Sequence, residues 1–152
     1  MMKKNLFRAC LLIVLLPITS YTLAADANKA IHTTDAVYPA IGPYSQMVQA
    51  GNTYYLSGVI ALDMSANSIQ GDTIEEQTHQ VLRYISEMLE AQGMTFANVV
   101  MSTVYMSDLT EFGTMNGVYS EYFTDQPPAR ATVGVAALPR GAKIEISVVA
   151  SK

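Results

Sequence analysis

The sequence predicts one α+β domain in which two helices cover one face of a β-sheet. Strand-like runs stand near the start and the end of the chain, and two segments between them repeat apolar residues at three-to-four spacing. The last third alternates apolar and polar residues, as half-buried strands do. About 128 residues follow an N-terminal apolar segment, which is enough for one ordinary core and too few for two.

Residues 1–24 have the pattern of a secretory signal peptide. Three basic residues precede an apolar run over 11–16, and small residues follow at Ala24 and Ala25. The run is shorter than the roughly 20 apolar residues that span a bilayer, and Pro17 interrupts it. An uncleaved membrane anchor is the alternative. We expect a signal peptide over 1–24, a loose mature N-terminus over 25–30, the folded domain over 31–152 and a periplasmic or secreted location.

The mature domain is acidic. The whole chain has a net charge of −4, and residues 1–24 carry three basic and no acidic residues, so removing them leaves a charge of −7. Nucleic acids are bound through Lys and Arg that neutralise phosphates, and anionic membranes attract basic segments. We therefore expect neither a nucleic acid nor, after removal of the signal, a membrane as partner.

The first predicted element of the domain is a β-hairpin. Residues 46–50 and 53–57 are short strand-like runs, and both residues of the Gly51-Asn52 turn between them tolerate positive φ. The two runs are therefore expected to pair as antiparallel neighbours.

An amphipathic helix is predicted over residues 73–92, where apolar residues form one stripe. Asp72, with Glu75 three residues later, fits an N-cap and capping box, and Gly93 fits a left-handed stop. His79 falls on the polar side of the stripe, so we expect it to be an exposed surface residue.

A buried strand and a second helix follow. Residues 99–106 are rich in β-formers, and Asp108, with Glu111 three residues later, predicts a helix start. Pro127-Pro128 ends the region and favours an extended chain. The apolar face of this helix consists of Leu109, Phe112, Met115, Val118, Tyr119, Tyr122 and Phe123.

Two further strands are predicted over 130–138 and 143–149. In both, apolar residues alternate with other types, and Arg130 and Glu145 lie on the less apolar sides. Two helices can cover only one face of the sheet. We therefore expect the second face, bearing Arg130 and Glu145, to meet water or another subunit.

The residue types exclude several kinds of catalysis. The single cysteine, Cys10, lies in the signal segment, and the two histidines, His32 and His79, are far apart in the sequence. A thiol nucleophile, a disulfide and a histidine metal site are therefore not expected, and no cofactor is expected either. A serine without a histidine base is no nucleophile, which removes a hydrolase triad.

Arg130 is the first candidate for a functional site. It directly follows Pro127-Pro128-Ala129, which holds its backbone stiffly, and its guanidinium is a rigid fork that suits a carboxylate. The alternative is an arginine that pairs with an acid at a subunit boundary.

Glu145 is the second candidate, because it stands between Ile144 and Ile146 in an otherwise buried strand. Burial raises the pKa of a carboxyl group and a nearby cation lowers it. Either shift makes the group usable as an acid or a base in catalysis. The alternative is an exposed glutamate paired with Lys143. If the last two strands formed a hairpin, Arg130 and Glu145 would be about 20 Å apart. A shared site then needs strands that are not adjacent, or residues from different subunits.

Two other places are weaker candidates. Tyr44 follows Gly42-Pro43, and from the sequence alone it reads best as an aromatic plug beside the hairpin. Ser57-Gly58 ends a strand, where a glycine lets another group approach the backbone closely.

Four motifs occur in a characteristic order between about Ile31 and Ser151. They are Ala40-Ile41-Gly42-Pro43-Tyr44-Ser45-Gln46, Leu56-Ser57-Gly58, Pro127-Pro128-Ala129-Arg130-Ala131-Thr132-Val133 and Leu138-Pro139-Arg140-Gly141-Ala142-Lys143-Ile144-Glu145-Ile146. Together they closely resemble the RidA family, also called the YjgF/YER057c/UK114 family.

The resemblance implies a chorismate-mutase-like fold assembled as a homotrimer, with sites in the clefts between subunits and a last strand that returns to the middle of the sheet. It implies hydrolytic deamination of enamine and imine acids, such as 2-aminoacrylate and 2-iminobutanoate, to 2-oxo acids and ammonia without cofactor or metal. By motif, Arg130 would hold the substrate carboxylate and Glu145 would activate water. The residues implied to complete the cleft are Tyr44, Ser57, Gly58, Asn116 and Thr132.

The chain departs from the usual family pattern at three positions near these motifs. Val59 stands where many members have glutamine, Gly134 replaces an acidic or amide residue, and Thr132 is cysteine in some members. The signal peptide is the larger departure, because most members work in the cytosol.

Two functions from different classes fit these observations. One is an exported imine deaminase, and the other is a trimeric module that binds small carboxylates or acts as a holdase without catalysis. A nuclease or translation-inhibitor activity, reported for some relatives, is disfavoured by the charge of −7.

Overall fold

The computed structural model describes residues 29–152. The expected signal peptide over 1–24 and residues 25–28 of the expected loose N-terminus lie outside the described residues. Lys29 and Ala30, expected in that N-terminus, instead begin a strand. None of the helices described is long and apolar enough to cross a membrane.

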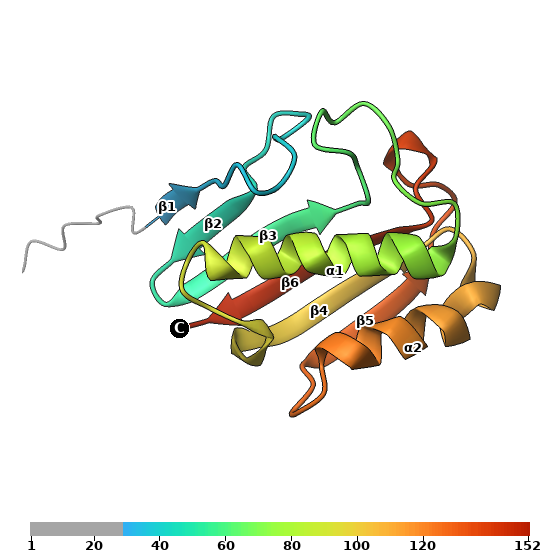
Figure 1. Ribbon diagram of the computed structural model, residues 1–152. Coiled ribbons are helices and arrows are strands. Elements are labelled where there is room, and N and C mark those ends of the chain that lie inside the picture. Colours follow the sequence, from blue (N-terminus) through green and yellow to red (C-terminus); the bar gives the residue numbers. More distant parts are fainter. Residues whose placement is uncertain (1–28) are drawn as a thin grey trace, which may run out of the picture.

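Six strands form one sheet in the order β1-β2-β3-β6-β4-β5 (Figure 1). Strands β4 and β5 run parallel, and the other neighbouring strands are antiparallel. The strands are β1 (Lys29–His32), β2 (Met47–Ala50), β3 (Thr53–Val59), β4 (Val99–Met106), β5 (Ala129–Gly134) and β6 (Ile144–Ser151). The last strand thus lies between β3 and β4 and does not pair with β5, as the resemblance implied.

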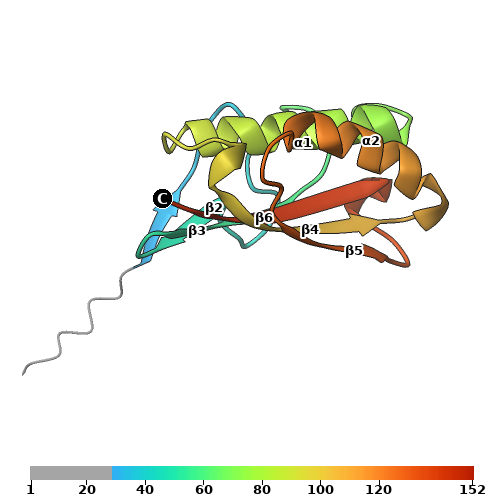
Figure 2. The same ribbon diagram turned by 90° about the horizontal axis from the view of Figure 1, so that it is seen from below.

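Two α-helices, α1 (Ile74–Glu90) and α2 (Phe112–Tyr122), lie on one face of the sheet, and the other face is open (Figure 2). Short 3-10 turns occur at Phe96–Asn98, Leu109–Glu111 and Pro139–Gly141. The α+β class with two helices on one face is therefore confirmed. The helices cover a core in which Ile144 and Ile146 of β6 are completely buried.

The N-cap of helix α1 lies one residue later than expected. The side chain of Thr73 accepts the backbone N–H of Glu76 at 3.2 Å, and the Glu76 carboxylate accepts the N–H of Thr73 at 3.1 Å. The capping box is therefore Thr73 with Glu76 and not Asp72 with Glu75. Threonine and aspartate both cap well, so the sequence pattern left the choice to the loop geometry. Gly93 has the expected left-handed φ of 66°.

Two expectations about which side chains are exposed near the helices were wrong. His79 is half-buried, because its Nδ1 lies 3.0 Å from the Tyr122 hydroxyl of α2. Leu109 and Phe112, expected on the apolar face of the second helix, are exposed. Asp108 caps the 3-10 turn before α2, where its carboxylate accepts the N–H of Thr110 at 2.8 Å. The apolar face therefore begins only at Met115.

The hairpin and the central strand occur where they were expected. β2 and β3 pair through the Gly51-Asn52 turn, and β4 has the predicted bounds. Strand β5 ends at Gly134, four residues before its expected end. Strand β5 lies at the edge of the sheet and pairs with β4, and this pairing ends where Met106 lies opposite Gly134. Among residues 29–152, no strand on its other side extends β5 further.

A candidate active site in two halves

Glu145 lies on the open face of the sheet. Its neighbours Ile144 and Ile146 point into the core, and side chains alternate along a strand, so the carboxylate emerges on the face that carries no helix. The side chain is half-buried, and burial raises its pKa above the ordinary value for glutamate. A raised pKa leaves the carboxylate better suited to accept a proton near neutral pH.

A bulge in β3 makes room for this carboxylate. The pairing of β3 with β6 shifts register between Leu56 and Val59, so Ser57 and Gly58 leave the regular ladder. A side chain at position 58 would collide with the Glu145 carboxylate, so glycine is required there by close approach. Bulges often re-aim groups next to active sites.

The Glu145 half of the site lines an open cavity of about 290 Å³. The Ser57 hydroxyl donates to the Ser45 carbonyl at 2.6 Å, which leaves it with a structural role. Tyr44 is 41% exposed, and its hydroxyl accepts the Ile41 N–H at 3.2 Å, so it is not a buried plug. The cavity is lined by Tyr38, Ile41, Tyr44, Ser57, Gly58, Ile60, Pro139 and Glu145.

Arg130 forms a separate half of the site beneath α2. Its guanidinium donates to Asn116 Oδ1 at 2.7 Å and stacks on the Tyr119 ring, 4.6 Å from the ring centroid. The Phe112 ring lies on the same guanidinium at 5.8 Å. These contacts fix the direction of the fork and leave its other N–H donors for an anion. Within the described part of the chain, Arg130 pairs with an amide and with no acid.

Three buried hydroxyl groups near Arg130 have no hydrogen-bond partner among residues 29–152. They belong to Ser102, Tyr119 and Thr132. Ser102 is the β4 residue directly opposite Arg130, and Thr132 lies two residues further on the same side of β5. Burial raises the pKa of Tyr119, so its phenol stays protonated. Buried polar atoms without partners are unusual, and Ser102 lies close enough to the Tyr119 hydroxyl to oppose the rise in its pKa.

The two halves lie on opposite faces of one sheet, which corrects the expectation that Arg130 and Glu145 share the open face. Arg130 is opposite the buried Ser102, on the helix side, whereas Glu145 is opposite Tyr105, on the open side. β4 separates the two strands, so the residues are roughly 10 Å apart across the sheet and about 10 Å along it. One chain therefore does not bring Arg130 and Glu145 together.

The alternative partner suggested for Glu145 is also excluded. Lys143 forms an ion pair with Glu111, with Nζ 3.2 Å from the carboxylate, and does not contact Glu145. No group of three or more His, Cys, Asp or Glu side chains that could hold a metal ion occurs within residues 29–152.

Sequence reasoning missed Tyr38 in the cavity and the roles of Ser102 and Tyr119 beside Arg130. The spacing of Asn116 and Tyr119, three residues apart on a helix, places both on one side and could have indicated a shared partner. Tyr38 lies in a connecting segment, Val37-Tyr38-Pro39, which has no periodicity to interpret.

Substituting Gly58→Ala should strongly lower the imine-deaminase turnover that the family resemblance implies, while leaving the fold intact. The added methyl group displaces the Glu145 carboxylate, and a shift of about 1 Å in a catalytic group can cost on the order of 10²-fold in rate. Gly113→Ala is a matched control, because a methyl group there meets no atom within 4 Å. Steady-state turnover and thermal melting of both variants check this; equal turnover in the two variants would contradict the close approach.

The fold and both halves of the site define a class of small α+β proteins with an arginine and a glutamate on opposite faces of one sheet. The family model described as Endoribonuclease L-PSP matches residues 17–152. The chain therefore belongs to this family, which is the RidA (YjgF/YER057c/UK114) family.

Named relatives agree with this assignment. A mouse protein called 2-iminobutanoate/2-iminopropanoate deaminase is 46% identical over 128 residues, which cover 84% of this chain and 94% of the mouse protein. Reactive Intermediate Deaminase A, chloroplastic, of Arabidopsis thaliana is 40% identical, over 89% of this chain and 73% of its own length.

Solved structures have the same fold. RidA from the Antarctic bacterium Psychrobacter superposes with a TM-score of 0.75 at 36% identity, over 79% of this chain and 97% of that chain. The E. coli protein TdcF with bound serine superposes with a TM-score of 0.76 at 32% identity, over 81% of this chain and 98% of that chain.

Proposed function

We propose that this protein hydrolyses reactive enamine and imine acids, such as 2-aminoacrylate and 2-iminobutanoate, to 2-oxo acids and ammonia. The single observation that carries the proposal is the half-buried Glu145 carboxylate, which lies against Gly58 in the cavity. Burial raises its pKa, which suits a general base. The names of the mouse and Arabidopsis relatives support the substrate class.

The reaction needs a positioned water and a proton acceptor. An imine carbon is already electrophilic, so neither a nucleophilic side chain nor an activated leaving group is required. Glu145 accepts a proton from water as the oxygen bonds to C2, and the C=N electron pair moves to nitrogen. Protonated Glu145 then returns this proton to the nitrogen. As the C–N bond breaks and the C=O bond forms, the hydroxyl proton passes to the nitrogen, which leaves as ammonia.

The substrate carboxylate would bind the guanidinium of Arg130. Because Arg130 and Glu145 of one chain face opposite sides of the sheet, the complete site would form between copies, with Arg130 from one and Glu145 from the next. Tyr55 and Val133 support such packing, because these apolar residues on the open face are 50% and 42% exposed. A homotrimer, which the family resemblance implies, would supply this arrangement.

The location is part of the same proposal. The basic start, the short apolar run and the small residues that follow it within 1–25 support an exported, periplasmic or secreted enzyme. An exported copy would act on imines that form outside the cytosol.

The proposal is tested by forming 2-iminobutanoate with an amino-acid oxidase and trapping the remaining imine with semicarbazide. The wild-type protein should reduce the trapped product, and Glu145→Gln should lose roughly 10²- to 10⁴-fold in kcat, because the amide keeps the shape but accepts no proton. Wild-type protein that leaves the yield of trapped imine unchanged would contradict the proposal.

The pH dependence of kcat provides a second readout. Glu145 must be ionised to accept a proton, and in the complex the substrate carboxylate would neutralise Arg130, so desolvation remains the main influence on its pKa. We expect kcat to fall on acidification through a pKa above the ordinary glutamate value of about 4.3. Glu145→Gln should abolish this pH dependence of kcat.

Binding without turnover is the second candidate function. The Arg130 guanidinium favours it, because its contacts with Asn116 and Tyr119 would orient it toward an anion whether or not a reaction follows. The TdcF structure, solved with bound serine, supports a small-carboxylate ligand. A protein that only binds would give a binding signal with a small carboxylate such as serine in calorimetry and would leave the rate of imine loss unchanged.

A further inference from the structure

Tyr38 is a buried polar residue of the Glu145 cavity to which the proposed reaction assigns no role. Only 5% of it is exposed, and it lines the cavity together with Tyr44 and Glu145. The other walls are mainly apolar, formed by residues such as Ile41 and Ile60. One polar group in such a wall is the usual means by which a pocket orients its ligand.

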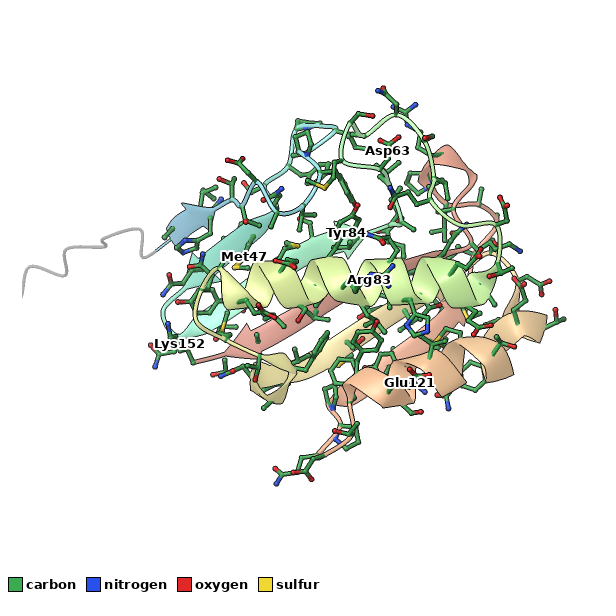
Figure 3. All side chains as sticks on the ribbon, viewed as in Figure 1. Met47, Asp63, Arg83, Tyr84, Glu121 and Lys152 are labelled. Carbon is green, nitrogen blue, oxygen red and sulfur yellow. The ribbon has the colours of Figure 1, made fainter. Side chains whose placement is uncertain are left out.

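Three contacts, two of the side chain and one of the backbone carbonyl, hold Tyr38 rigidly. Its hydroxyl accepts the Ile60 N–H at 3.1 Å, its carbonyl accepts the Gln46 amide at 2.9 Å, and its ring packs edge-on against Tyr84 at 5.5 Å between centroids. Tyr84 extends from α1 toward the loop that follows β3, where its own hydroxyl donates to the Leu62 carbonyl at 2.6 Å (Figure 3). The phenol of Tyr38 is therefore fixed before any ligand enters.

The hydroxyl of Tyr38 still has a proton to donate. The Ile60 N–H occupies an acceptor position on the oxygen, and no residue in the described part of the chain accepts the phenolic O–H. Burial is the main reason that the pKa of Tyr38 rises to about 12, with smaller contributions from Tyr44 and Glu145. The group thus remains a neutral donor over the whole working pH range.

The cavity is larger than the proposed small substrates need. Its 290 Å³ equals on the order of ten water molecules at about 30 Å³ each, which exceeds the volume of the ethyl side chain of 2-iminobutanoate. Glu145 must contact the water that attacks the reacting carbon, so the substrate would lie beside the carboxylate and its side chain would extend into the part of the cavity lined by Tyr38, Ile41 and Ile60.

We propose that Tyr38 determines specificity by donating a hydrogen bond to an acceptor atom on the side chain of the substrate. The inference rests on the proposed function, because it concerns the side chain of the same imine acid. It predicts a preference for side chains that carry an oxygen acceptor over all-carbon side chains of the same shape.

The test uses matched pairs of imine acids formed in situ from amino acids. O-methylserine is compared with norvaline, and O-methylhomoserine with norleucine, because in each pair one ether oxygen replaces a methylene group. For at least one pair, the wild-type kcat/KM should be roughly three- to tenfold higher for the ether, as expected for one neutral hydrogen bond. Tyr38→Phe should remove this ratio and retain turnover of the all-carbon substrate.

Tyr84→Phe is the matched control, because it removes a buried phenol from the same aromatic pair without removing a group from the cavity wall. It should keep the ether preference even if its melting temperature falls. Equal kcat/KM for ether and carbon side chains in the wild type, or an unchanged ratio in Tyr38→Phe, would overturn the inference. Failure of the proposed function is distinguishable, because the wild type would then turn over neither member of a pair.

Discussion

Arg130→Ala is expected to lower kcat/KM for 2-iminobutanoate by roughly 10²- to 10³-fold, as when one partner of a buried charge pair is truncated. The guanidinium is prepared for an anion by Asn116 at 2.7 Å and the Tyr119 ring at 4.6 Å. Lys143, another cation of the described part of the chain, is already paired with Glu111. The assay is the loss of imine against semicarbazide trapping.

The control must remove a positive charge without touching either half of the site. Arg83 on α1 serves this purpose, because it is exposed and, among residues 29–152, donates only to Gln80 at 2.7 Å (Figure 3). Arg83→Ala should retain wild-type turnover, and both variants should have the oligomeric mass of the wild type in light scattering. Full activity in Arg130→Ala would reject the assignment of this arginine as the carboxylate-binding group.

The sequence predicted the elements well where one periodicity dominates. The apolar stripe of α1 and the alternation of Ile144 and Ile146 in β6 define buried surfaces on their own, because few other arrangements bury those residues. The capping residue was misplaced by one position, since Asp72 and Thr73 are equally able to cap. Such local choices depend on the loop that leads into the helix.

The sequence failed where tertiary packing overrides alternation. In β5 the apolar Val133 suggested a core-facing side, which assigned Arg130 to the opposite side. In the structure Arg130 faces the helices, because the aromatic ring of Tyr119 and the amide of Asn116 replace water around the guanidinium. Val133 is left exposed on the open face. Alternation gives two faces of a strand, but long-range packing decides which one is buried.

Under the proposed function, this reversal implies that a complete site would form between copies of the chain and not within one chain. Two variants that are each expected to be inactive, Arg130→Ala and Glu145→Gln, can show whether the complete site forms between copies. Co-expressed with different tags and purified through both tags, they would give mixed trimers of the proposed assembly. We expect such trimers to recover about one third of the wild-type turnover.

The expected recovery follows from the symmetry of a closed ring of three copies. If each cleft takes Arg130 from one copy and Glu145 from the next, every mixed trimer has one cleft in which both residues are intact, whichever variant is present twice. If the site formed within single chains, every site would lack one of the two residues and mixing would restore nothing. The opposite faces of Arg130 and Glu145 in one sheet favour the first outcome, since side-chain motion alone does not carry either group through the sheet.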